Sequence, residues 1–144
     1  MNRIGITLIE LSLGITIIGI LSAIAVPRLS FVADSAAVRL EAQRVTEALD
    51  AARGSALRFH RPTELTFESP SWQVSTTLDG DDIITWRAPD ARTSGVTISG
   101  TGAPIRFGRA GIGVGASNRT IVLTRGLATR RIVISRLGRI TSGG

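Results

Sequence analysis

The feature that most constrains this chain is a largely apolar stretch from Ile6 to Val26, which ends at Pro27. Glu10 is the only charged residue within it. A helix needs about 20 consecutive apolar residues to cross the hydrocarbon core of a bilayer, and this stretch has that length. A secretory signal instead has an apolar run of about 7–15 residues, followed by a small-residue cleavage site. The stretch therefore predicts a helical membrane anchor.

Glu10 lies near the start of this anchor. An unpaired carboxylate in lipid costs roughly 2.5–3.5 kcal/mol on insertion scales, so an acid at such a position usually has a functional role. In a bundle of these helices, Glu10 would pair with a free α-amino group on a neighbouring subunit and set the register between subunits. The alternative is an ordinary single-pass anchor with one stray acid near its end.

A short leader that contains Arg3 and ends at Gly5 precedes the run Ile-Thr-Leu-Ile-Glu at residues 6–10. This arrangement resembles the class III signal of type IV pilins and type II secretion pseudopilins. The resemblance implies that prepilin peptidase cuts between Gly5 and Ile6 and N-methylates Ile6, where most family members have Phe. It makes Glu10 the fifth residue of the mature chain, with a role in subunit assembly, and it assigns a helix kink to Pro27.

Beyond Pro27 the sequence predicts that the helix continues as an amphipathic helix to about Phe59. Apolar residues recur there at three- to five-residue spacing, close to one helical face: Leu29, Val32, Ala36, Leu40, Val45, Leu49, Ala52 and Ala56. The charged residues fall mostly elsewhere: Arg39, Glu41, Arg44, Glu47 and Asp50. Pro62 lies beyond the expected end of the helix.

From Thr63 onward the pattern changes to short strands separated by Gly and Ser clusters. Strands are expected at residues 64–68, 72–75, 83–86, 96–98, 105–107, 120–123 and 131–134, and an Asp-Gly pair at residues 79–80 predicts a hairpin turn. No second helix is evident. The predicted fold class is α+β, with a long N-terminal α-helix packed on a C-terminal antiparallel β-sheet domain.

The soluble region is similar to the GspH/FimT group of minor pseudopilins and minor pilins. The similarity lies in residues 49–58 with the strand that follows, in residues 107–111, and in the closing strands at residues 130–135 and 138–140. It implies a pilin-like organisation: a leader at 1–5, a transmembrane or filament-core helix at 6–27, its amphipathic continuation at 28–61 and a β-rich globular domain at 62–144. It also implies a single-pass inner-membrane location, with the C-terminal domain in the periplasm.

Charge is unevenly distributed along the chain. All 17 basic residues are arginines, and residues 91–144 hold nine of them without any acid, whereas residues 64–90 carry six acids and one arginine. An acid-free basic segment attracts phosphates or an acidic partner. Some minor pilins of this group bind DNA through a C-terminal Gly-Arg-x-Arg, and Gly138-Arg139-Ile140 fits that motif, with Thr141 in place of the second Arg.

The candidate residues for DNA binding or subunit docking are Arg130, Arg131, Arg136, Gly138 and Arg139. Arg106, Arg109, Arg119 and Arg125 belong to the same basic segment. Alternation along strands would send some of these side chains to opposite faces. A solvated basic surface, or one that docks an acidic neighbouring subunit, is the alternative to DNA binding.

Other motifs have simple structural explanations. The glycine-rich run at residues 111–115 lacks the following helix that a phosphate loop needs, so a loop or bulge is expected. Asp79, Asp81 and Asp82 fall short of the six to eight oxygens that calcium takes, and a hairpin explains them. Trp72 and Trp86 are expected to pack across strands or in the core.

The chain has no Cys, no Lys and one His, His60, which is expected to be solvated or to cap the helix end. No disulfide forms, and no nucleophile–base pair or metal cluster is expected, so the chain is predicted to be neither an enzyme nor a cofactor-binding protein.

The leading functional hypothesis is a minor pseudopilin of a type II secretion system, a structural filament subunit. The first alternative is a type IV pilus minor pilin that binds double-stranded DNA during natural transformation. The second is a membrane-anchored domain that does not polymerise. The expected partners are other pilins or pseudopilins, prepilin peptidase and inner-membrane lipid, with double-stranded DNA added under the first alternative.

Overall fold

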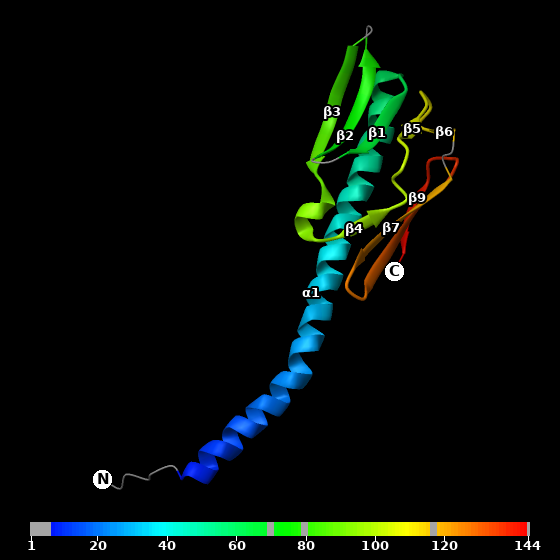
Figure 1. Ribbon diagram of the computed structural model, residues 1–144. Helices are drawn as coiled ribbons and strands as arrows, with labels where there is room; N and C mark the ends of the chain where they lie inside the picture. The colour runs from blue at the N-terminus through cyan, green and yellow to red at the C-terminus, as the bar shows by residue number, and fades with distance from the viewer. Residues whose placement is uncertain (1–6, 69–70, 79–80, 116–117, 144) are drawn as a thin grey trace. The chain divides into compact units, whose positions relative to one another are not determined.

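The computed structural model describes residues 7–68, 71–78, 81–115 and 118–143. The chain divides into two compact units, Met1–Ala33 and Asp34–Gly144. One long helix, α1 (Leu8–Phe59), contributes to both units (Figure 1). The predicted N-terminal helix is therefore confirmed, including its end at Phe59.

Thr7 caps the start of α1. The backbone N–H of Glu10 donates to Thr7 Oγ1 at 3.3 Å, and the N–H of Leu11 donates to the Thr7 carbonyl at 3.1 Å. A Thr followed three residues later by Glu is a capping-box sequence. The hydroxyls of Ser12 and Thr16 donate back to carbonyls of the helix at 2.9 and 2.8 Å. Internal bonds of this kind leave these hydroxyls satisfied without water.

The helix ends at a residue in the left-handed conformation. His60 has a φ of 49° and is exposed, as expected for a residue at the helix end. A left-handed residue just past the last turn is a common way for a helix to stop. Pro62 follows, and its ring cannot continue the helical hydrogen bonding.

In the second unit, α1 buries a stripe of mostly small side chains at three- and four-residue spacing. The stripe comprises Val38, Glu41, Ala42, Val45, Ala48, Leu49, Ala52 and Ala56. The predicted apolar face was correct from Val45 onward and wrong before it, because Leu29, Val32, Ala36 and Leu40 are exposed. A helix turns about 100° per residue, so Leu40, five residues before Val45, points about 140° away from the stripe.

Glu41 also differs from the predicted face of α1, because it is buried where Leu40 is exposed. It was placed off the apolar face, yet it is fully buried, with Oε1 accepting a bond from Arg44 Nη1 at 2.9 Å. Glu41 Oε2 has no hydrogen-bond partner among the described residues. Its position four residues before Val45 places it on the buried stripe despite its charge.

The second unit contains two sheets in which neighbouring strands are antiparallel. In spatial order, the first sheet comprises β3 (Asp81–Pro89), β2 (Ser71–Leu78), β1 (Thr63–Glu68), β5 (Ile105–Phe107) and β6 (Gly113–Val114). The second comprises β4 (Thr97–Ser99), β7 (Arg119–Arg125), β8 (Ala128–Ile134) and β9 (Ile140–Gly143). A short 3₁₀ helix, η1 (Ala91–Ser94), precedes β4. The α+β fold class is thus confirmed.

Each strand predicted from the pattern is present, and β6 is additional. The closing strand that the family similarity implied at residues 138–140 is found as β9, which starts later, at Ile140. The predicted hairpin is supported by pairing of Leu78 with Asp81, while the turn residues Asp79 and Gly80 lie outside the described residues. The glycine-rich segment is a turn followed by the two residues of β6, which pair with β5. β6 is only two residues long, as expected from the weak strand tendency of glycine.

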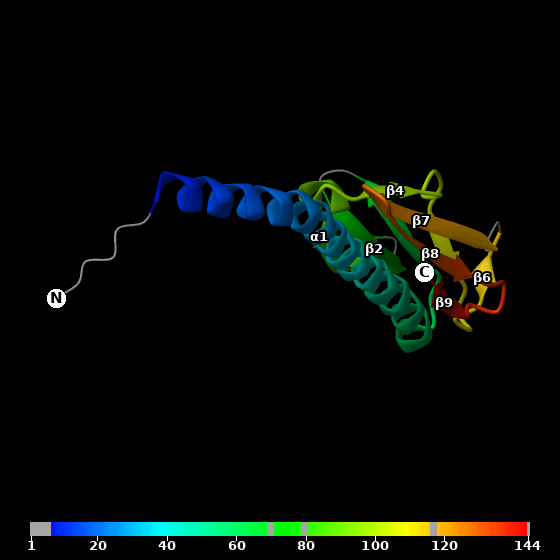
Figure 2. The same cartoon turned by 90° about the horizontal axis from the view of Figure 1, so that it is seen from below.

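The core forms where α1 of the second unit meets both sheets (Figures 1 and 2). Leu65, Trp72, Val74 and Phe107 come from the first sheet, and Ile121, Leu123, Ile132 and Ile134 from the second. The rings of Phe67 and Trp72 meet edge to face, with centroids 5.3 Å apart. Trp86 lies opposite Val74 and packs against this core, so the packing role predicted for both tryptophans is confirmed.

Trp72→Ala is expected to destabilise the second unit by about 3–5 kcal/mol, because Trp72 is 2% exposed and its removal leaves a cavity. The matched control is Trp86→Ala, which removes a half-buried ring and should cost less. The chain has two tryptophans, so each variant keeps one as its fluorescent reporter during urea unfolding of the full chain in detergent. Equal losses in the two variants would contradict the core position of Trp72.

Candidate functional site

The N-terminal site combines a long apolar helix surface with one acid. Among the described residues, α1 is the one helix long and apolar enough to cross a membrane, and the qualifying window is not buried. Its large apolar side chains from Leu8 to Ile24 are 49–86% exposed. Glu10 is exposed in the first turn of the helix. Such a surface needs lipid or other apolar helices around it.

The predicted site also includes Gly5, Ile6 and Pro27. Gly5 and Ile6 lie outside the described residues, so cleavage and methylation stay predictions. The backbone of α1 continues through Pro27, but its side chain is not among those described, and the kink also stays a prediction. The sequence reasoning missed the cap on α1, although Thr7 and Glu10 carry its signature.

Several arginines of the C-terminal segment are engaged in contacts within the second unit. Arg106 Nε bonds Glu64 Oε2 at 2.7 Å, and this hydrogen bond, followed by the charge of the carboxylate, raises the pKa of Arg106. Arg125 Nε pairs with Asp34 Oδ1 at 2.9 Å, linking the end of β7 to α1. Arg119 donates to the carbonyl of Ala103. These arginines therefore link β5 to β1, β7 to α1, and β7 to the loop that contains Ala103.

Arg130 and Arg131 lie on opposite faces of β8. Along β8, buried or half-buried residues alternate with exposed ones. Arg130 is half-buried and lies on the same face as Ala128 and Ile132, whereas Arg131 is exposed. Arg130 also lines a cavity with Arg39 of α1. Because successive side chains of a strand point to opposite faces, these two candidate arginines do not share one surface.

Arg136, Gly138 and Arg139 belong to a tight turn that is joined to a second one. In the first turn, Ser135 N donates to the Arg139 carbonyl at 2.9 Å, and Gly138 N donates to the Ser135 carbonyl at 3.0 Å. The second turn is closed by Gly108 N, which donates to the Ile112 carbonyl at 2.8 Å. Gly113 N then donates to the Arg136 carbonyl at 3.2 Å and joins the turns. We call residues 108–113 and 135–139 the loop pair.

Gly138 explains how closely the two turns approach. Its φ is +75°, and a Cβ at this position would lie 2.5 Å from the carbonyl oxygen of Gly111. A residue other than glycine is therefore excluded both by conformation and by contact. The loop pair joins the turn that carries Arg109 to the turn that carries Arg136 and Arg139, an arrangement that the sequence reasoning did not anticipate. The sequence signal for these two tight turns was a glycine in each, Gly111 and Gly138, and both have a positive φ.

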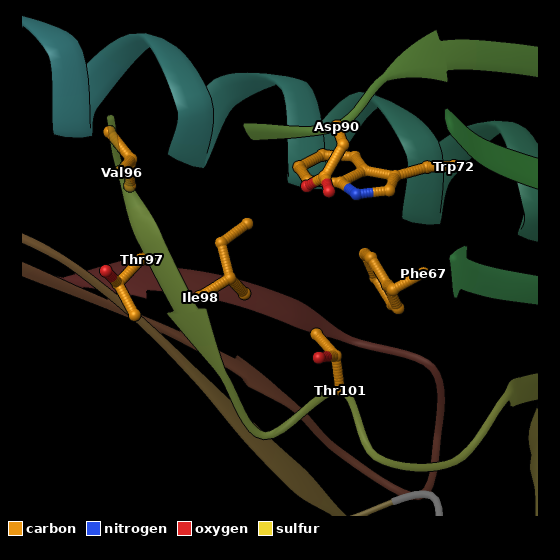
Figure 3. A pocket seen from close by; sticks show the side chains of 7 residues that line it. All are labelled: Phe67, Trp72, Asp90, Val96, Thr97, Ile98 and Thr101. Atoms are coloured by element: carbon orange, nitrogen blue, oxygen red, sulfur yellow. The ribbon is translucent and has the colours of Figure 1, made fainter. Parts of the chain in front are cut away.

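A cavity of about 330 Å³ lies between strands of the two sheets. Figure 3 shows Phe67, Trp72 and Asp90 toward one side of it and Val96, Thr97 and Ile98 toward the other, and Thr101 completes the lining. Its lining has one carboxylate and no imidazole, so it offers no nucleophile–base pair. Nor do the described residues contain a group of three or more His, Cys, Asp or Glu side chains arranged to hold a metal ion. Of the acids considered for calcium, Asp79 lies outside the described residues.

The comparisons with known proteins agree with this geometry. The family model described as type II transport protein GspH matches residues 41–138. Among curated proteins, no sequence gives a significant match. Two crystal structures of the Pseudomonas aeruginosa PAO1 type IV minor pilin FimU share the fold, in space groups P21 and P65. The first has a TM-score of 0.65 and 17% identity, and the match covers 74% of this chain and 88% of that one. The second has a TM-score of 0.62 and 16% identity, with coverage of 74% and 92%.

Proposed function

Because this chain belongs to the GspH family of type II transport proteins, we propose that it is a minor pseudopilin of a type II secretion system. It is a structural subunit of a periplasmic filament that acts in protein secretion. Prepilin peptidase removes residues 1–5 and methylates Ile6, and the helix then holds the chain in the inner membrane with the β sheets in the periplasm. The observation that carries the proposal is the match of the GspH family model to residues 41–138, which span the last part of α1 and strands β1 to β8.

The helix supplies the mechanism of assembly. Its large apolar side chains from Leu8 to Ile24 are exposed, so neighbouring helices can replace lipid around them during entry into a filament. Glu10 then pairs with the α-amino group of Ile6 on the adjacent subunit. A charge pair formed away from water is strong and sets one register between subunits. The chain acts mechanically and without catalysis.

Deleting the gene tests the proposal directly. The expected result is that secreted substrates accumulate in the periplasm and that the full chain, supplied in trans, restores secretion. Twitching motility and DNA uptake, measured in the same strains, report on type IV pilus function. Unchanged secretion together with lost DNA uptake would overturn the secretion assignment.

A second candidate function, DNA binding by a minor pilin, is favoured by the loop pair. Arg109, Arg136 and Arg139 are all exposed there, and residues 91–144 contain no acid to oppose them. Contacts with phosphates release counterions, so such binding would be independent of sequence and would weaken steeply with salt.

Binding of the full chain to double-stranded DNA across a salt series tests this function. Arg136→Glu with Arg139→Glu is expected to lower the salt slope by about 2, since each lost phosphate contact removes about one unit. Arg61→Glu with Arg87→Glu makes the same charge change at exposed arginines outside residues 91–144 and should leave the slope nearly unchanged. Absence of binding at low salt would remove the DNA hypothesis.

A further inference from the structure

The cavity between the two sheets has no part in filament assembly as proposed above. Its volume of about 330 Å³ lies at the small end of the range for ligand sites, about 300–1,000 Å³. Figure 3 shows Phe67, Trp72 and Asp90 toward one side of it and Ile98 toward the other. A space of this size and lining accommodates one long side chain, with an apolar stem between the walls and a polar end at Asp90.

The two strands beside this cavity each have a side without a paired strand. β1 pairs with β5 only from Thr63 to Leu65, and Phe67, which lines the cavity, lies beyond that pairing. β4, which contributes Ile98, pairs with β7 and forms one edge of the second sheet. Thr97 and Ser99 of β4 are exposed. Because an open strand edge pairs readily with an extended segment of another chain, β4 offers a place for a peptide backbone next to the cavity.

The charge of the cavity selects a cation. Asp90 is the one charged side chain among the described residues of the lining, and residues 64–90 carry six acids and one arginine. A carboxylate accepts several hydrogen bonds, so the contact that Asp90 already has within the chain leaves capacity for another donor. Rings such as those of Phe67 and Trp72 also attract cations. An ammonium has three donors and a guanidinium five, so a lining with a single carboxylate suits lysine better than arginine.

We propose that the cavity and the edge of β4 bind an extended, lysine-containing segment of another protein. The segment adds a strand to β4, and its lysine side chain enters the cavity, with the stem against Phe67 and Ile98 and the ammonium at Asp90. This chain has no lysine, so the segment comes from a different protein and not from a second copy. The contact does not depend on the secretion assignment: binding by a chain whose deletion leaves secretion intact would keep this contact and reject the proposed function.

Fluorescence titration of the full chain in detergent with a synthetic peptide tests the contact. The probe is the acetylated and amidated peptide Thr-Val-Lys-Val-Thr, and Trp86→Phe leaves Trp72, which lines the cavity, as the single tryptophan. A saturable change in Trp72 emission is expected. The same peptide with norleucine in place of lysine keeps the stem without the charge and should bind severalfold more weakly. A peptide with N-methylated valines keeps the side chains but loses backbone donors for β4, and it should also bind severalfold more weakly.

Asp90→Asn provides the decisive arm, because it removes the charge and keeps the size of the side chain. It should lower the affinity for the lysine peptide to that for the norleucine peptide and leave the norleucine affinity unchanged, which misfolding would not produce. Asp82→Asn is the matched control: it removes a carboxylate of β3 outside the cavity lining and still accepts the bond from Thr77, so it should change neither affinity.

Three results would overturn the proposal. The first is the absence of a saturable change in Trp72 emission. The second is equal binding of the lysine and norleucine peptides, or an equal loss in the Asp90→Asn and Asp82→Asn variants. The third is binding of N-acetyl-lysine methylamide as tight as that of the whole peptide, because it would show a site for a free amine without strand addition.

Discussion

Replacing Glu10 with glutamine or alanine is expected to exclude the chain from filaments while leaving it in the membrane. Glutamine removes the charge that pairs with the α-amino group of the neighbouring Ile6 and leaves that amine unpaired. Removing one partner of a buried ion pair costs about 3–5 kcal/mol. That energy corresponds to a loss of more than about a hundredfold in association. The measurement is the ratio of chain in sheared filaments to chain in membranes.

Glu10 also occupies the acid position of a capping-box sequence, so its replacement requires a control. Glu10→Gln keeps a residue suited to a capping box, whereas Thr7→Ala removes the hydroxyl that caps the helix and leaves the carboxylate. We expect assembly to fail with the first change and to survive the second. If both variants lose assembly equally, the helix cap and not the charge pair explains the need for Glu10. Normal assembly of Glu10→Gln would contradict the charge-pair role of Glu10, whereas absence of the unmodified chain from filaments would support a membrane-anchored domain that does not polymerise.

Gly5→Val is expected to block removal of residues 1–5 and, through that, assembly. The resemblance to pilins places the cut after Gly5, and glycine allows a closer approach of the backbone to a protease than a β-branched residue does. Without cleavage, Ile6 has no free α-amino group to pair with Glu10 of a neighbour. Intact mass measured on the chain from membranes should show the leader retained in this variant and absent from the unmodified chain.

Gly14→Val is the matched control for Gly5→Val. It makes the same substitution within the anchor, at a glycine whose added Cβ would meet nothing within 4 Å. We expect this variant to be processed normally. Loss of processing in both variants would indicate a general defect of the anchor and would contradict the assignment of the cleavage site to Gly5.

The C-terminal end of α1 and the positions of most strands were predictable because their signals are local. Pro62 and the change of period after Phe59 marked the end of the helix, and the alternation around Trp72 and Ile121 marked strands. The hairpin between β2 and β3 followed from an Asp-Gly pair. Turn chemistry and hydrophobic period act within a few residues, so one sequence is enough to detect them.

The buried face of α1 and the grouping of the arginines depend on contacts between distant segments. Loosely spaced apolar residues placed Leu40 on the buried stripe and Glu41 off it, and only packing against the sheets reverses this assignment. Likewise, the hydrogen bond from Gly113 to Arg136 joins two turns that are distant in sequence. Strand alternation did predict that some of the arginines would lie on opposite faces, and Arg130 and Arg131 of β8 do so.

The central claim is that this chain is a processed subunit of a filament, and peptide sequencing of purified filaments tests it most directly. Cells that produce the full chain together with its secretion machinery are sheared, and the filaments are separated from membranes. We predict that the filament fraction contains this chain and that its N-terminal residue is Ile6. Detection of the chain in membranes alone, or with residues 1–5 still attached in the filaments, would contradict the account.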